Sequence, residues 1–123
     1  MLFERRYWAR LVANRIGVHH RSREGELLVG MCLWASKESD RIAKRAVGWT
    51  LPKRDSILAA AIGMARNNAA VAEVARRLGL EPKQSLMLLD RYRRAAIDIA
   101  DAHGLTQIAD QGRRDRIGMR TQM

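Results

Sequence analysis

The chain has 123 residues, 47% of them hydrophobic, and its 23 Lys and Arg outnumber 13 Asp and Glu to give a net charge of +10. This length favours one domain that can bury a core of its own, and the hydrophobic content excludes a wholly disordered chain. The positive charge favours a polyanionic partner: nucleic acid, an anionic membrane surface or an acidic protein.

A cytoplasmic location is expected. The single cysteine, Cys32, excludes an internal disulfide, which is typical of reducing compartments. The longest strongly apolar run, Leu27 to Ala35, is far shorter than the roughly 20 residues that span a bilayer, and the N-terminus lacks the long apolar stretch of a secretory signal. No contact with a membrane core is therefore predicted.

The first 50 residues are predicted to form helices that build the core and a dimer contact. Aromatic and aliphatic residues recur at helical spacing from Phe3 to Val12, and Gly17 is a plausible stop. The polar segment that follows, which contains His19 and His20, is predicted to be a solvated loop.

Two more helices are expected before residue 50. Ser22 is predicted to cap the first of them, which contains the apolar run and places Cys32 and Trp34 in the core or at a subunit contact. A separate segment is predicted to begin at Ser39. The residues predicted to pack in it are Ile42, Ala46, Val47 and Trp49.

The segment 71–94 is the most informative part of the sequence. A short apolar-periodic stretch ends at Gly79, a Glu-Pro pair follows, and a longer periodic stretch opens at Lys83 and can run to His103. Two helices joined by a glycine-containing turn can cross steeply, which leaves one face of the second helix free to enter a groove. The segment therefore predicts a helix-turn-helix.

The free face of that second helix carries side chains suited to contacting DNA. They are Lys83, Gln84, Met87, Arg91 and Arg94. Because they recur every three or four residues, they share one side of a helix and are predicted to face the major groove. Phosphate contacts are expected from a second basic set: Lys53, Arg54, Arg76 and Arg77.

Residues 54–93 also carry a pattern of apolar residues around a glycine. Its positions are Val74, Ala75, Leu78, Gly79, Leu80, Leu86 and Leu89. This pattern resembles the helix-turn-helix units of bacterial transcription regulators, and the preceding helix and asparagine give a faint likeness to the Fis-type subclass. The resemblance implies sequence-specific binding of double-stranded DNA, often as a homodimer, in a regulator of the bacterial or phage kind.

The sequence departs from that pattern in two places. Such units usually bury the residue six positions after the glycine, and here that residue is Ser85, with Leu86 following it. The turn is therefore expected to be one residue longer, or the second helix to be rotated. The spacing from Asn68 to Gly79 is also too long for the Fis-type pattern.

No catalytic site, metal site or cofactor is predicted. Adjacent residues such as His19 and His20 point about 100° apart on a helix, which is unsuited to a pair of zinc ligands. His103 near a helix end is an ordinary match to the helix dipole, and Cys32 lies in an apolar run that makes a thiol inert. No glycine-rich phosphate loop is present.

Together these features predict an all-α domain of five to six helices over residues 1–111. Residues 1–50 supply the core and dimer contact, residues 51–111 hold the helix-turn-helix, and 112–123 form a flexible basic tail. The predicted function is regulation of transcription by a homodimer bound to double-stranded DNA. Three alternatives remain: a simple helical hairpin with a solvated basic face, a non-enzymatic adaptor for an acidic protein partner, and membrane-surface attachment through the first helix.

Overall fold

The computed structural model describes the backbone of residues 2–122 and the surroundings of side chains 4–114, and within these residues every regular element is helical. The elements in chain order are α1 (Leu2–Arg15), α2 (Arg23–Val47), α3 (Lys53–Gly63), the 3-10 helix η1 (Met64–Arg66), α4 (Asn68–Leu78), α5 (Pro82–Ala102) and α6 (Thr106–Gln122). The predicted all-α class is confirmed, with six α-helices in the described backbone.

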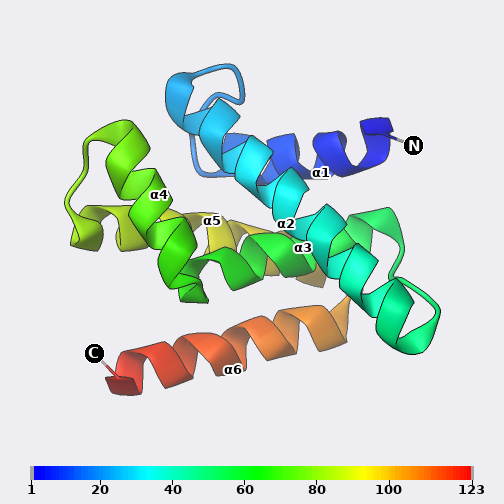
Figure 1. The fold of residues 1–123 in the computed structure, drawn as a ribbon. Helices are drawn as coiled ribbons and strands as arrows, with labels where there is room; N and C mark the ends of the chain where they lie inside the picture. Colours follow the sequence, from blue (N-terminus) through cyan, green and yellow to red (C-terminus); the bar gives the residue numbers. More distant parts are fainter. Residues whose placement is uncertain (1, 123) are drawn as a thin grey trace.

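The helices α3 and α5 pack against each other at the centre of the molecule, with α1 and α6 on opposite sides of them (Figure 1). Fully buried side chains from both central helices, among them Ile57, Leu58, Leu89 and Tyr92, form the core. α2 crosses over α1 and α3, and α4 packs on α5. The core therefore holds the central part of α5 in place while its beginning reaches the surface.

α2 is one helix of 25 residues, so the predicted separate segment beginning at Ser39 is wrong. The cap predicted at Ser22 is confirmed, because its hydroxyl oxygen accepts from the Gly25 N–H at 3.1 Å. The apolar pattern is interrupted by Ser36 and Asp40, but these residues lie four apart on the inner face of α2 and are buried. α2 therefore continues through these polar residues, which belong to a buried network with its neighbours.

That network joins three helices. The Arg5 guanidinium of α1 lies 2.7 Å from the Asp40 carboxylate and donates to the Ser36 hydroxyl at 2.6 Å. Ser56 of α3 donates to Asp40 at 2.9 Å and shares a 2.6 Å hydrogen bond with Ser36. Each of these buried polar groups therefore has partners on neighbouring helices, which fixes the positions of α1, α2 and α3 relative to one another.

The second half of α2 extends beyond the core. Trp34 is exposed, and so are all four residues predicted to pack within the chain: Ile42, Ala46, Val47 and Trp49. That prediction is therefore wrong. α2 ends at Gly48, whose positive φ and N–H bond to the Lys44 carbonyl close the helix before the chain turns back to α3.

The backbone of residues 112–122 is helical, so the predicted flexible tail is wrong for these residues. Gly112 lies inside α6, where a Cβ atom would stand 2.9 Å from the Ile97 side chain and 3.0 Å from that of Ile62. Its role is close packing of α6 on α5 and α3. Arg113 adds ion pairs to Asp101 at 2.7 Å and to Asp110 at 2.5 Å.

Candidate nucleic-acid interface

α4 has a defined start and a defined end. The Asn67 side chain accepts from the N–H groups of Ala69 and Ala70 at 2.9 and 3.2 Å, which caps its first turn. At its end Gly79 adopts a left-handed φ of 66°, and the Leu80 N–H bonds back to the Ala75 carbonyl at 2.9 Å. Gly79 is the residue type that this turn favours, because an L side chain is strained at such a φ.

α5 begins immediately after the turn, at Pro82. Proline is suited to a first helical position because its fixed φ matches the helix and it has no N–H to satisfy. Glu81 and Gln84 form a reciprocal capping box, in which the Gln84 side chain accepts from the Glu81 N–H at 3.0 Å. The helix continues to Ala102, with His103 at its C-terminal cap, as the sequence pattern predicts.

Ser85 occupies the buried position between the two helices. Its side chain is fully buried and its hydroxyl donates to the Val71 carbonyl of α4 at 2.6 Å. Leu86, in contrast, is only partly buried. The residue six positions after Gly79 therefore faces α4, so neither a longer turn nor a rotated helix is present, and a hydrogen-bonded serine replaces the apolar residue.

The predicted face of α5 is exposed as one stripe. Lys83, Gln84, Met87, Arg91 and Arg94 are all exposed, and the Met87 side chain is 59% accessible. Some of these groups already have partners within the chain. Arg91 donates to the Ile16 carbonyl at 2.6 Å, and Arg94 pairs with Asp90 at 3.3 Å. Lys83 and Met87, near the start of the helix, make no hydrogen bond or ion pair among the described residues.

Arg76 and Arg77 stand at the end of α4, close to the turn. Both donate to the Glu73 carboxylate, Arg76 at 2.9 Å and Arg77 at 2.7 Å, and these bonds lower the pKa of Glu73, with the Arg76 hydrogen bond the largest cause. All three side chains remain partly or largely exposed, so this cluster keeps one net positive charge beside the start of α5.

Lys53 and Arg54 are at the other end of the molecule. The Arg54 guanidinium lies 5.8 Å from the centre of the Trp8 ring, and Trp8 packs edge-on at 4.9 Å against His103, the cap at the far end of α5. The 21 residues of α5 separate the two ends by roughly 30 Å at 1.5 Å per residue. The structure therefore does not bring Lys53 and Arg54 together with the other predicted contacts.

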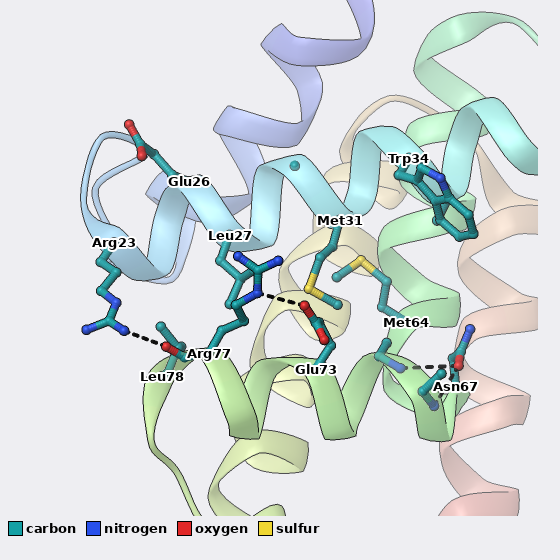
Figure 2. A pocket seen from close by; sticks show the side chains of 14 residues that line it. Arg23, Glu26, Leu27, Met31, Trp34, Met64, Asn67, Glu73, Arg77 and Leu78 are labelled. Carbon is teal, nitrogen blue, oxygen red and sulfur yellow. Dashed lines mark hydrogen bonds and ion pairs between the residues drawn. The ribbon is translucent and has the colours of Figure 1, made fainter.

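The loop between α1 and α2 lies beside the helix-turn-helix, and this arrangement was not predicted. One end of the loop is held by the bond from Arg91 to the Ile16 carbonyl. At the other end the Arg23 side chain donates to the Arg77 carbonyl at 2.7 Å (Figure 2). The loop sequence, with two histidines and two arginines between glycines, is the signal that could have indicated a basic surface here.

The loop is packed against the first turn of α2. A Cβ atom on Gly25 would overlap the carbonyl oxygen of His19, so the backbone of the loop fills the space that any other side chain would occupy. The rings of His19 and His20 are stacked with centres 4.6 Å apart. The pKa of His20 is lowered, mainly by reduced hydration of the ring and to a lesser degree by the positive charges around it. The lowered pKa favours a neutral ring at neutral pH.

The described residues contain no cluster of three or more His, Cys, Asp or Glu side chains that could hold a metal ion. No helix in the described part of the chain is both long and apolar enough to cross a bilayer. Comparison with protein-family models, curated proteins and solved structures gives no match to this chain.

Proposed function

We propose that this protein is a non-enzymatic, cytoplasmic regulator of transcription that binds double-stranded DNA as a homodimer. The observation that supports this proposal best is the start of α5. A helix N-terminus with a capped first turn projects from the core and exposes Lys83, Gln84 and Met87 on one side. A helix presented in this way can enter a major groove with its first turns.

The surroundings of α5 support a division of labour. Arg76 and Arg77 at the end of α4, and the basic loop before α2, flank the start of α5 and suit contacts to phosphates. Lys83, Gln84 and Met87 are the groups placed to meet base edges, and Gln84 can do so with its amide N–H₂ while its carbonyl oxygen remains in the capping box. Lys53 and Arg54 have no part in this interface.

An adaptor function for an acidic protein partner is the second candidate. One observation favours it: Arg91 and Arg94 are already bound to the Ile16 carbonyl and the Asp90 carboxylate, which reduces their freedom to reach into a groove. Such an exposed basic surface can also receive a carboxylate-rich segment. The two functions differ in whether binding depends on base sequence.

Two lysine variants test the DNA-binding surface. A preferred duplex is first selected from a random pool, and the affinity for it and for a scrambled duplex is measured by fluorescence anisotropy at several salt concentrations. Lys83→Ala is expected to weaken binding and to lower the salt slope by up to about 0.9, because it removes one cation from the surface that faces the DNA. Lys53→Ala, which removes the same charge at the far end of the molecule, is the control and should bind as wild type.

Gln84→Ala tests sequence recognition. The variant is expected to lose about 1–3 kcal/mol on the selected duplex and little on the scrambled one. Because Gln84 also caps α5, a modest loss of stability is expected, and a melting curve must show that the variant is folded at the assay temperature. If Lys83→Ala and Gln84→Ala both bind the two duplexes as wild type does, α5 does not bind DNA and the adaptor function is favoured.

A further inference from the structure

The outer part of α2 exposes several large apolar side chains. Trp34 is 67% accessible, Ile42 is 55% and Trp49, just after the helix, is 63%. Single exposed apolar residues are common on protein surfaces, but a group of them along one helix and the turn after it marks an interaction surface.

A groove lies beside the first half of this helix. It runs between α2 and α4, has a volume of about 760 Å³, and is lined by Leu27, Met31, Met64 and Leu78, with Trp34 at its edge (Figure 2). The Glu73–Arg77 ion pair and the Arg23 side chain border it at the α4 side. The groove is therefore mainly apolar, with charged groups along its rim.

Gly30 forms part of the groove wall. It lies within the length of α2 and is exposed to solvent. A Cβ atom placed on it would meet no other atom within 4 Å. A glycine at such a position costs about 1 kcal/mol relative to alanine. No contact within the chain requires a glycine there, whereas the open space above it suits a bulky side chain from outside.

Several residues lie on the same side of α2 as Gly30. They form the α2 stripe: Gly30, Trp34, Glu38, Arg41 and Arg45. Their spacing of three or four residues places them on one face, and Trp49 follows four residues after the last of them. The open space at Gly30 and the exposed ring of Trp49, which stands just past the end of the helix, therefore lie toward opposite ends of α2.

We propose that a second copy of the chain docks on the α2 stripe, with the two α2 helices antiparallel about a twofold axis that passes between residues 39 and 40. Residues at equal distances from that point then lie opposite one another. The facing pairs are Gly30 with Trp49, Trp34 with Arg45, and Glu38 with Arg41. A single axis thus gives a tryptophan over an open glycine, a cation over an aromatic ring and an ion pair, each formed twice.

This complementarity favours a second copy over a different partner, because one chain carries both the open space at Gly30 and, just past the end of the same helix, the side chain that fits it. Glu38 and Arg41 now pair with each other within one chain, and both are accessible enough to exchange partners across the axis. The inference rests on the homodimer in the proposed function and adds the surface that forms it. It narrows the dimer contact predicted for residues 1–50 to one face of α2.

Sedimentation velocity without DNA tests the surface. The wild-type chain is expected to dimerise in the micromolar range, and Trp49→Ala and Gly30→Leu should each raise the dimer dissociation constant at least about tenfold. Gly30→Leu should not lower the melting temperature of the monomer, because the space is open and leucine favours helix. Val47→Ala is the control, since this equally exposed residue lies on the opposite side of α2.

A charge exchange tests the antiparallel register. Glu38→Arg alone and Arg41→Glu alone should each be monomeric, because like charges then face each other across the axis. An equimolar mixture of the two variants should form a heterodimer, because both opposite-charge pairs are restored. A wild-type chain that remains monomeric, or a dimer indifferent to all these variants, would overturn the inference. DNA binding of the same samples distinguishes this outcome from a failure of the α5 interface.

Discussion

Cys32 shows how burial alone determines the chemistry of one residue. Its thiol is fully buried, 3.5 Å from the Ile57 carbonyl, and burial raises its pKa from 9.0 to about 12. Because the folded protein holds this proton more tightly than the unfolded chain, the resulting stabilisation is complete below pH 9 and is lost as the pH rises toward 12. Between these limits the slope is about 1.4 kcal/mol per pH unit.

We therefore expect the free energy of unfolding to fall more steeply between pH 9 and 10.5 in the wild type than in Cys32→Ala. Urea titrations at several pH values measure the two slopes. Burial, and after it Cys32, raises the pKa of the Tyr92 hydroxyl, so the substitution removes part of that shift, while the larger part, due to burial, is present in both chains. Parallel pH profiles in the two chains would show that the thiol ionises without unfolding.

Single residues were predictable where local backbone geometry determines the choice. Ser22 and Gly79 perform the capping and turn roles that their types and positions indicate. Ser85 was not predictable, because its burial depends on a hydrogen bond to a carbonyl of another helix. The bond from Arg91 to α1 joins residues 75 apart, and no local pattern contains it.

At the scale of elements, α6 depends on close packing at Gly112. Gly112→Leu is expected to destabilise the protein by about 1–3 kcal/mol, because the added side chain must displace those of Ile97 and Ile62. Urea unfolding measures the loss, and limited proteolysis should show earlier cleavage within residues 106–122. The same substitution at Gly30, where the space is open, is the matched control, provided that all chains are measured at a concentration at which they are monomeric. Equal stability of the two variants would show that α6 does not need the close approach.

Two elements differed from the predictions for a common reason. In α2 a separate segment is predicted from Ser39, close to the buried polar residues Ser36 and Asp40, and in α6 a flexible tail is predicted from Gly112 onward. Both features are satisfied only by neighbouring helices, through the Arg5 network and through contact with Ile97. In the sequence alone, a buried polar residue or a glycine of this kind looks like the end of a helix, because the packing partners that accommodate it lie on other helices.

At the scale of the whole molecule, the polar network between α1, α2 and α3 is the feature most sensitive to change. Asp40→Ala leaves the buried Arg5 charge without its carboxylate, and a destabilisation of about 3–5 kcal/mol is expected. The double variant Arg5→Met with Asp40→Leu removes both charges and should recover most of the loss. Chemical denaturation of the three chains measures this, and a single variant as stable as wild type would mean that the network does not hold the helices together.

The candidate interface was predictable only in part. The exposed stripe of α5 follows from helical spacing, and the nearby Arg76 and Arg77 follow from their place before the turn. The sequence could not place Lys53, because its distance from the interface depends on how α3 packs against α5. The contribution of the α1–α2 loop depends in the same way on tertiary contacts.

The contact between Gly25 and the backbone of His19 limits which residues can replace the glycine. Every amino acid except glycine has a Cβ atom, so any missense change in this codon would push the loop away from α2. The loop could still vary at its outward side chains, because these are not confined by the contact. New contacts in this loop would therefore arise by exchange of its exposed residues, while residue 25 itself could not change.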